Sequence, residues 1–488
     1  MSSRVRGSTP MTDTTVPLVI GRSLVPGADG SYPVFNPARP DEVVLMAPVT
    51  SPGQLDQAAA AARRSQPAWA ALGFEGRLSV LQQACDRAMA ALDLDATAAL
   101  LTREHGKVLV ESLFDVATTA GMVGALAPLV AEALEPRPAG TSVVEQVAHG
   151  VVAAILPFNW PAAVMGNKIL PALLAGNTVV VKTPPTCPGA VLMLAGAIAA
   201  GLPAGVLSAV NGPSPELGAA LVAHPDVDMV SFTGGISTGR SVLAACASRL
   251  RPAVLELGGN DPAIVGPDLE PSEELADRLL EAAFATSGQV CMAIKRLYVP
   301  AEHLQGWREA LVARMSCAVV GDGLDDGVTM GPVHTEAARD RVEAMIAESA
   351  TGATEVIRPA TVTAPGRGWM VSPAIVVAPS PACGLVREEQ FAPALPLLPY
   401  EQVDQAVAAA NDTGFGLCAS VWSGDDELAG TVARQLSAGT VWTNAHGMGA
   451  MDHLAPMGGW GDSGIGIELG VEGMAAFTRP RVQRRGTL

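Results

Sequence analysis

The sequence predicts an α/β fold built from two doubly wound domains. The first observation is that short β-rich apolar runs alternate with helical segments in two successive series. Such alternation is typical of parallel sheets that helices cover on both faces. The second observation is length, because 488 residues exceed what one ordinary hydrophobic core holds. Apolar residues form 49% of the chain, which is enough material for two cores.

The first series begins near residue 150 and follows two predicted helices. Helical periodicity predicts these upstream helices at Leu55–Ala71 and Leu78–His105. Continuous apolar runs then predict buried strands at Val151–Leu156, Thr178–Lys182, Val206–Val210, Asp228–Phe232 and Ala253–Leu257. The helices between them are expected at Gly189–Ala200, Pro215–Ala223 and Ser237–Ala247.

The second series begins after Cys291. Its strands are expected at Lys295–Val299, Met370–Ile375, Leu395–Tyr400, Ala419–Trp422 and Thr440–Thr443, and its helices at His303–Cys317, Ala337–Ser349, Val403–Asn411 and Asp426–Leu436. Glu256 closes the first series and Cys291 opens the second, so both are expected at the seam between the domains. Ligand sites favour such seams and the carboxyl ends of parallel strands.

Charge and cysteine content exclude several classes of function. A net charge of −17 and a pI near 4.8 argue against binding to nucleic acid or to anionic membranes, since both need clustered Lys and Arg. The seven cysteines are scattered and form no CxxC pair, so neither a disulfide framework nor a metal site is predicted. A reducing, cytoplasmic location is expected.

Two segments look like targeting or membrane signals without meeting the requirements. The stretch Pro188–Val210 is uncharged and long enough to span a bilayer, but helix-breaking residues at Gly201–Gly205 divide it into a buried helix and a buried strand. Residues 1–11 have no apolar segment behind their two arginines, so a loose tail is expected and not a signal peptide. Met11 is an alternative start.

Cys291 and Glu256 form the most informative pair of residues. Cys291 lies in Ser287–Met292, 35 positions after Glu256 in Leu255–Asn260. A thiolate attacks a carbonyl well, and a nearby carboxylate can activate water against the resulting thioester. Each residue alone has an ordinary alternative, because a free Cys is usually a small buried apolar side chain.

Two turns that follow predicted strands add to this pair. Phe232–Gly239 opens a predicted helix, a placement that suits a bound phosphate, although glycine turns are common there without one. Lys182, at the end of a predicted strand, can contact a ribose hydroxyl or a phosphate. The ordinary alternative is a lysine that points into solvent. Asn159 in Pro157–Pro161 can donate its amide to a developing oxyanion, and the alternative is local bonding within the turn.

Together these motifs resemble the aldehyde dehydrogenase superfamily in order and spacing, from about Phe35 to the C-terminus. The resemblance rests on Pro157–Pro161, Phe232–Gly239, Leu255–Gly259, Gly288–Cys291, Glu388–Pro393 and Pro456–Glu468. It implies a Rossmann-like cofactor domain at 1–128 and 150–257 and a catalytic domain at 258–458. It also implies an oligomerisation arm and C-terminal strand at 129–149 and 470–488.

The resemblance implies oxidation of an aldehyde to the carboxylic acid with NAD or NADP. Cys291 would form a thiohemiacetal whose oxyanion is held by the Asn159 amide, and hydride would pass to the nicotinamide. Glu256 would activate the water that hydrolyses the thioester, which argues against acyl transfer to coenzyme A. A catalytically silent homologue and a cysteine esterase or thioesterase remain as alternatives. The retained pair weighs against the first, and the nucleotide-side motifs weigh against the second.

The resemblance also implies a set of cofactor residues. They are Ile155, Leu156, Phe158, Lys182, Pro185, Gly235, Gly258, Glu389 and Phe391. Lys182 would meet the adenosine ribose, and Glu389 with Phe391 would hold the nicotinamide ribose. Pro185 stands where family members that prefer NAD carry a Glu that repels a 2′-phosphate, so we expect NADP to be tolerated.

On the substrate side the resemblance implies Trp160, Asn167 and Met457. Asn167 and Met457 stand where aromatic residues are usual, so a mixed polar and thioether pocket is expected. Such a pocket argues against a quaternary ammonium aldehyde, because that cation binds best among several aromatic faces. His446 and His453 are expected near the tunnel through which the substrate would enter, as residues that form structural hydrogen bonds.

The implied partners are a small aldehyde and further copies of this chain. Leu129–Gly150 would project and pair with a strand near Thr478–Val482 of another subunit, and Val143–Val147 is strand-like. A homodimer or homotetramer is therefore expected, with neither nucleic acid nor a membrane as a partner.

Overall fold

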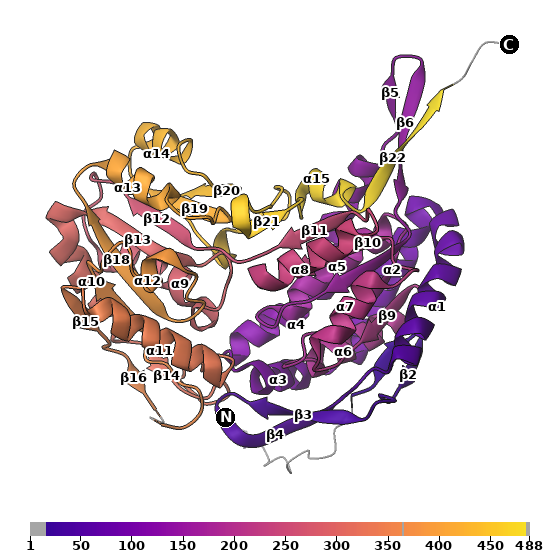
Figure 1. The fold of residues 1–488 in the computed structure, drawn as a ribbon, viewed down its shortest axis with the longest axis horizontal. Helices are drawn as coiled ribbons and strands as arrows, with labels where there is room; N and C mark the ends of the chain where they lie inside the picture. The colour runs from indigo at the N-terminus through magenta and orange to yellow at the C-terminus, as the bar shows by residue number, and fades with distance from the viewer. Residues whose placement is uncertain (1–15, 364–365, 485–488) are drawn as a thin grey trace.

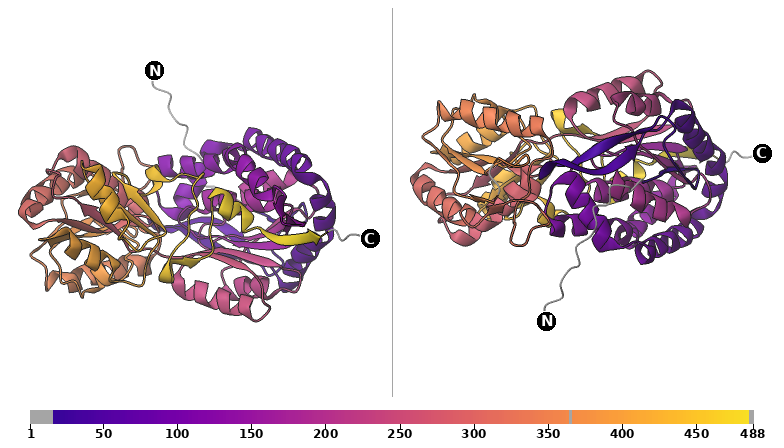
Figure 2. Two further views of the ribbon diagram at one scale, coloured as in Figure 1. Left: turned by 90° about the horizontal axis from the view of Figure 1, so that it is seen from above. Right: turned by 90° about the horizontal axis from the view of Figure 1, so that it is seen from below.

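The computed structural model describes residues 16–363 and 366–484. It consists of two lobes and an arm that projects from one of them (Figure 1). Views from above and below show the orange second lobe at one end of the molecule and the indigo helices of the first lobe at the other (Figure 2). The predicted N-terminal tail and the alternative start at Met11 lie outside the described residues.

The first lobe contains an eight-stranded sheet. In spatial order its strands are β2 (Ser23–Val25), β1 (Leu18–Ile20), β9 (Leu207–Val210), β8 (Thr178–Lys182), β7 (Val151–Ile155), β10 (Met229–Thr233), β11 (Ala253–Glu256) and β21 (Gly464–Ile465). The five central strands are parallel, as predicted, whereas β1, β2 and β21 pair antiparallel at the edges.

Helices cover both faces of this sheet, because alternate strand residues are apolar on each side. In β7, Val152 and Ala154 join one apolar cluster while Val151 and Ala153 join the other. The first face carries α2 (Gly73–Ala91), α3 (Leu94–His105), α4 (Leu109–Leu134), α5 (Pro161–Leu174), α6 (Gly189–Ala200) and α15 (Gly470–Ala475). The second carries α1 (Pro52–Ala71), α7 (Pro215–Ala223) and α8 (Ile236–Ala247).

The second lobe contains a seven-stranded sheet. Its order is β15 (Glu355–Ile357), β17 (Ala374–Val377), β18 (Ala394–Tyr400), β13 (Ile294–Pro300), β12 (Asp261–Val265), β19 (Cys418–Trp422) and β20 (Thr440–Thr443). Only β15 pairs antiparallel. Its helices are α9 (Glu273–Phe284) and α10 (Leu304–Met315) on one core, and α11 (Glu336–Ala350), α12 (Gly384–Arg387), α13 (Val403–Asn411) and α14 (Asp426–Ala433) on the other.

Smaller elements complete the two lobes. They are the hairpin β3 (Ser31–Asn36) and β4 (Arg39–Pro48), the pair β14 (Val319–Val320) and β16 (Thr361–Val362), and the 3-10 turns Ala285–Gly288, Ala301–His303, Met448–Ala450 and Gly461–Ser463. The prediction of two doubly wound α/β domains is confirmed.

Two predicted elements were wrong in detail. The expected helix Leu78–His105 is two helices, because Asp93 begins α3 as an N-cap and accepts a hydrogen bond of 3.0 Å from the Ala96 N–H. Apolar residues keep the helical spacing on both sides of the break, so the sequence pattern does not reveal where the first helix ends. The strand expected at Met370–Ile375 begins only at Ala374, directly after Pro373, whose nitrogen cannot donate to a sheet.

The arm is a three-stranded sheet in the order β22-β6-β5, with β5 at Arg137–Ala139, β6 at Ser142–Ala148 and β22 at Thr478–Arg484. The projection was expected to start at Leu129, but α4 continues to Leu134 within the first lobe. The predicted pairing with another subunit's strand was also wrong. β22 pairs antiparallel with β6 of its own chain along its whole length (Figure 1).

The short connection into β22 explains this pairing. Helix α15 packs on α4 next to the base of the arm, and only Ala476 and Phe477 separate it from β22. The Phe477 carbonyl accepts a hydrogen bond of 2.9 Å from Asn177 Nδ2, and His149 bonds the Ala476 carbonyl at 3.2 Å. The last strand therefore starts beside the arm of the same chain.

The lobes touch directly at the turn after α3. Gly106 has a φ of 101° there. A Cβ atom on Gly331 would lie 1.9 Å from the Gly106 carbonyl oxygen, and one on Gly323 would lie 2.5 Å from that of Lys107. No other residue type fits this contact without moving backbone.

The uncharged stretch Pro188–Val210 is divided as predicted, into α6 and β9. Within residues 16–363 and 366–484, no single helix is long and apolar enough to cross a bilayer. The halves of α4, Leu109–Thr119 and Gly121–Leu134, reach that length and composition only together, and they meet at 44°.

Candidate active site

The seam between the lobes brings Glu256 and Cys291 into one site, as predicted. Glu256 is the last residue of β11, and Cys291 lies in the loop before β13. Burial raises the pKa of the Cys291 thiol and the charge of Glu256 adds to the rise, which places the carboxylate within electrostatic reach of the sulfur. Only Cys291 of the pair is partly exposed, while Glu256 is buried.

The loop that carries Cys291 is preceded by an unusual turn. Thr286, Ser287 and Gly288 have φ angles of 53°, 56° and 73°, all in the left-handed region that favours glycine. Gly288 is also confined, since an added Cβ would lie 2.6 Å from the Ala392 carbonyl oxygen. The turn leads directly into the loop that carries Cys291.

Asn159 reaches this loop from the first lobe. Its Nδ2 donates a hydrogen bond of 2.9 Å to the carbonyl oxygen of Gln289 and its side chain is buried. One amide hydrogen is used in this bond, so the second is left to donate elsewhere. That arrangement suits an oxyanion formed at Cys291.

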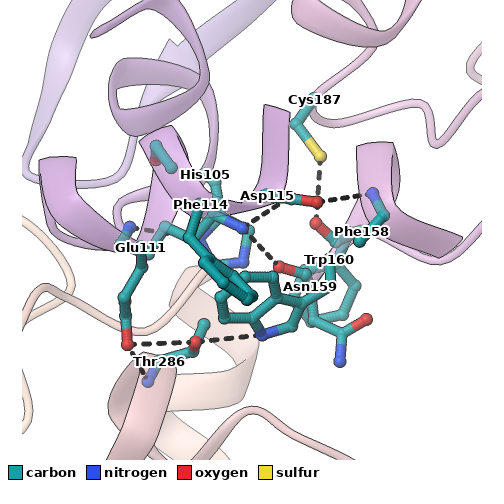
Figure 3. A network of polar contacts seen from close by, with 12 residues as sticks. His105, Glu111, Phe114, Asp115, Phe158, Asn159, Trp160, Cys187 and Thr286 are labelled. Carbon is teal, nitrogen blue, oxygen red and sulfur yellow. Dashed lines mark hydrogen bonds and ion pairs between the residues drawn. The ribbon is translucent and has the colours of Figure 1, made fainter. Parts of the chain in front are cut away.

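A buried ion pair supports the backbone of Asn159. Lys107 Nζ donates to Asp115 at 2.6 Å and to the Asn159 carbonyl at 3.0 Å, and it lies 4.1 Å from the centre of the Trp160 ring. Asp115 in turn accepts the Ala163 N–H at 2.6 Å in the first turn of α5. Figure 3 shows Asp115, Asn159 and Trp160 within this polar network.

The Cys291 thiol resists ionisation. Burial raises its pKa to about 12, and the nearby cation of Lys295 opposes this only in part. Lys295 itself donates to the Val290 carbonyl at 2.5 Å. Forming the nucleophile therefore needs a base or an added positive charge close to the sulfur.

Glu256 is poised to take up a proton. Burial is the main reason why the pKa of its carboxyl lies well above the usual range, and repulsion from Glu468 adds to the rise. The Lys168 cation opposes it. Glu256 Oε1 is buried and has no hydrogen-bond partner among the residues that the structure describes. Lys168 is paired with Glu468 and donates to Ser231 Oγ at 2.9 Å. An unpartnered basic oxygen of this kind can accept a proton from water or from a thiol.

A cleft of about 820 Å³ opens at the carboxyl ends of the first sheet's strands. Seven of the predicted cofactor residues line it: Ile155, Leu156, Phe158, Lys182, Pro185, Gly235 and Phe391. Burial lowers the pKa of Lys182 to about 8. Gly258 and Glu389 do not line the cleft, but they lie next to each other. The Glu389 carboxylate accepts a hydrogen bond of 3.0 Å from the N–H of Gly259, the residue after Gly258. A Cβ on Gly258 would meet the Glu389 carboxylate at 2.2 Å.

The cleft suits a dinucleotide. Gly235 is the N-cap of α8 and carries no side-chain cap, and an added Cβ there would meet no atom within 4 Å. The free N–H groups of that helix end are therefore open to a phosphate. In the described residues, no three His, Cys, Asp or Glu side chains cluster as a metal site would.

The sequence matches a known family over most of its length. The profile of the aldehyde dehydrogenase family matches residues 24–482. The chain belongs to the aldehyde dehydrogenase family. As an aldehyde dehydrogenase it oxidises an aldehyde with NAD(P) as the cofactor.

Three relatives show how close the match is. Geranial dehydrogenase of Castellaniella defragrans is 36% identical over 468 residues, which are 94% of this chain and 96% of that protein. Phenylacetaldehyde dehydrogenase of Pseudomonas fluorescens is 34% identical over 95% of this chain and 94% of its own. The crystal structure of a C291A mutant of aldehyde dehydrogenase C from Pseudomonas syringae, with NAD+ and octanal, is 32% identical. It superposes with a TM-score of 0.90 and covers 99% of this chain and 98% of its own.

The surroundings of Cys291 in this aldehyde dehydrogenase are apolar and rich in methionine. Trp160 and Val290 form a buried cluster against which Cys291 and Met457 pack. Other partly buried residues on the same cluster are Met448, Met451, Val164 and Trp442. Phe114 of α4 meets Trp160 edge-on, with ring centroids 6.0 Å apart, and is 56% exposed (Figure 3). Met457 therefore lies among the methionines around Cys291, and the mixed polar and thioether substrate pocket stays a prediction.

The polar residues that were expected near the substrate lie in different surroundings. Asn167 lies on α5, outside the apolar cluster, and its Oδ1 is buried without a partner. His446 is buried and bonds Ser420 Oγ at 2.8 Å, which agrees with the structural role expected for it. His453 is half-buried, and burial lowers its pKa.

Sequence reasoning missed part of the cofactor cleft. His334 lines the cleft and stacks on Phe158 with ring centroids 4.3 Å apart and planes 8° apart. Its Nε2 shares a hydrogen bond of 2.5 Å with Thr186, which also lines the cleft. Arg341 is a further lining residue, held by the Glu389 carbonyl at 2.9 Å. No local pattern marks these three residues, because distant segments contribute them.

Proposed function

We propose that this aldehyde dehydrogenase releases the free acid, with Cys291 as nucleophile, Asn159 as oxyanion donor and Glu256 as base. The observation that carries the proposal is the hydrogen bond from Asn159 to the Gln289 carbonyl, two residues before Cys291. It brings the amide donor of one lobe to the nucleophile loop of the other. The unpartnered Glu256 oxygen supports the third role.

The proposed chemistry has two stages. The Cys291 sulfur, after losing its proton to Glu256 or water, bonds the aldehyde carbon, and the oxygen becomes an oxyanion that accepts from Asn159. Bound NAD(P) supplies the acceptor for the hydride that leaves this carbon. Glu256 first passes to solvent any proton that it took from the thiol. It then takes a proton from water as the water oxygen attacks the thioester, and the carbon–sulfur bond breaks to release the acid and the Cys291 thiolate.

The cofactor side favours tolerance of NADP. Pro185 lines the cleft near Lys182, and it offers no carboxylate to repel a 2′-phosphate. Its carbonyl accepts a hydrogen bond of 2.6 Å from the Tyr32 hydroxyl, which holds this turn in place. We therefore propose that both NAD and NADP serve as cofactors.

The substrate is proposed to be an apolar aldehyde. Cys291 packs in a cluster of Trp160, Val290 and methionines, and flexible thioethers adapt to apolar chains of different shape. Val110 and Phe114, one helical turn apart on α4, expose 70% and 56% of their surface. The relatives named for geranial and phenylacetaldehyde and the octanal complex are consistent with this class.

Assembly and location are proposed more broadly. We propose a division into a cofactor domain at 1–128 and 150–257, a catalytic domain at 258–458 and an arm, and the separate sheets of the two lobes support it. A homodimer or homotetramer is proposed, because the outer strand β5 leaves a sheet edge that a second copy can cover. A cytoplasmic location is proposed from the scattered cysteines, which form no CxxC pair.

The test of the proposed function is an aldehyde panel. The protein is mixed with NAD or NADP and with octanal, citral, phenylacetaldehyde or betaine aldehyde, while the absorbance of the reduced cofactor is followed. Turnover of the three apolar aldehydes, with loss in Cys291→Ala, is expected. Turnover of betaine aldehyde alone would contradict the substrate class, and an active Cys291→Ala variant would contradict the nucleophile.

A further inference from the structure

The turn that precedes Cys291 is held in a conformation that costs energy. Thr286 has φ 53° and ψ 39°, and Ser287 has φ 56° and ψ 36°. A non-glycine residue in this region costs roughly 1–3 kcal/mol, and Thr is the less tolerant of the two because it is β-branched. Two such residues in succession persist only where neighbouring groups hold them.

One of the holding groups comes from the other lobe. Glu111, in the first turn of α4, accepts the Thr286 N–H at 2.6 Å and the Thr286 hydroxyl at 3.2 Å (Figure 3). Burial of this carboxyl raises its pKa, and Lys107 opposes the rise. An acid in a first helical turn is ordinarily explained by the helix dipole alone. That explanation does not account for two hydrogen bonds to a strained residue in a different lobe.

The same hydroxyl ties the turn to the oxyanion residue. Thr286 Oγ1 donates to Glu111 and accepts a hydrogen bond of 3.1 Å from Trp160 Nε1. Trp160 directly follows Asn159 in the chain. The path from Glu111 through Thr286 and Trp160 therefore sets the nucleophile loop against the amide that is to receive the oxyanion.

The next residue of the turn is fixed independently. Ser287 Oγ donates to the Gly331 carbonyl at 2.8 Å, a contact within the second lobe. Gln289 Nε2 donates a hydrogen bond of 3.1 Å to the Thr286 carbonyl oxygen, which closes the turn on its C-terminal side. Among the described residues that bond Thr286 and Ser287, Glu111 and Trp160 are the ones that reach across from the first lobe.

We propose that Glu111 is a positioning residue of the reaction. Its carboxylate oxygen holds the left-handed turn at Thr286 and Ser287, and thereby aligns the Cys291 sulfur with the Asn159 amide. The inference rests on the proposed roles of Cys291 and Asn159. Glu111 touches no reacting atom, so it works through acceptance of hydrogen bonds and not through proton transfer.

The test compares two substitutions of one residue. Glu111→Gln keeps an oxygen that can accept from Thr286, whereas Glu111→Ala removes it. Glu132→Ala is the matched control, since Glu132 is an exposed acid on the same helix. The readouts are the single-turnover rate of octanal oxidation at saturating NADP and the Kd for NADP by fluorescence.

The expected result is a split between rate and binding. Glu111→Ala lowers the single-turnover rate by about 10- to 100-fold, as a misplaced reacting group does, with the Kd for NADP unchanged. Glu111→Gln recovers most of that loss, and Glu132→Ala matches the parent enzyme. A rate in Glu111→Ala within about twofold of the parent, or a Gln variant as slow as the Ala variant, would overturn the proposal.

A second pair of variants covers the case in which Glu111→Ala does not fold. Thr286→Ser keeps the bridging hydroxyl, and Thr286→Val removes it while keeping the branched shape. Valine is expected to slow the single turnover and serine to preserve most of it, and equal rates would contradict the inference. Cys291→Ala tests the underlying assignment separately, because alanine has no nucleophilic atom and turnover in that variant refutes the nucleophile whatever the Glu111 variants do.

Discussion

The side-chain amide of Asn159 donates a hydrogen bond of 2.9 Å to the carbonyl oxygen of Gln289. This bond joins the first lobe to the loop that carries Cys291. We expect Asn159→Ala to lower kcat by about 100- to 1000-fold, because one donor to the developing oxyanion is lost. KM for the aldehyde should change much less. Steady-state kinetics check this, and a kcat loss below about tenfold would remove Asn159 from the mechanism.

Glu256→Gln should leave the first stage possible and block the second. The amide cannot take a proton from water, so the thioester on Cys291 should accumulate. We expect one equivalent of reduced cofactor per active site in a rapid burst, followed by slow turnover. Intact-protein mass spectrometry after mixing with octanal should detect the acyl adduct. Undiminished steady-state turnover without an adduct would assign the base elsewhere.

The choice between NADP and NAD should depend on pH. Burial lowers the pKa of Lys182 to about 8, so this side chain is a cation below that pH and loses its proton as the pH rises through it. A 2′-phosphate is attracted only by the cation. The ratio of kcat/KM for NADP to that for NAD should therefore fall above about pH 8. In Lys182→Met this ratio should be low at every pH. If the ratio of the parent enzyme does not change with pH, Lys182 does not have this role.

Lys107→Met should destabilise the protein strongly. Lys107 and Asp115 are both fully buried, so removal of the cation leaves a charged carboxylate without its partner. Breaking such a pair costs about 3–5 kcal/mol in the free energy of unfolding. Adding Asp115→Asn should restore part of this loss, since Asn can still accept from the Ala163 N–H. Arg308→Met, at a surface ion pair, is the control and should leave urea unfolding almost unchanged.

The proposed catalytic residues could be picked out because each lies in a short contiguous motif. Asn159 follows β7 and Glu256 ends β11, so strand patterns place these two at the same edge of the first sheet. Cys291 lies before β13 of the second sheet, and its motif, not a strand end, singled it out. Pro185 and Gly235 follow β8 and β10 and could be predicted from strand ends in the same way.

His334 and Glu111 could not be predicted in this way. His334 joins the cofactor cleft from a loop of the second lobe, and its neighbours Phe158 and Thr186 are more than a hundred residues away. Glu111 reads in the sequence as an ordinary first-turn acid, and only the three-dimensional contact with Thr286 distinguishes it. The partner of β22 was missed because strand pattern does not say whose strand it pairs with.

The close packing of Gly331 on Gly106 has a mechanical consequence. Lys107 directly follows Gly106, and its ammonium bonds the Asn159 carbonyl. A side chain at Gly331 would press on the Gly106 carbonyl and so push on the segment that carries Lys107. Bulk added at the contact between the lobes would therefore reach the backbone of Asn159 without touching the site itself.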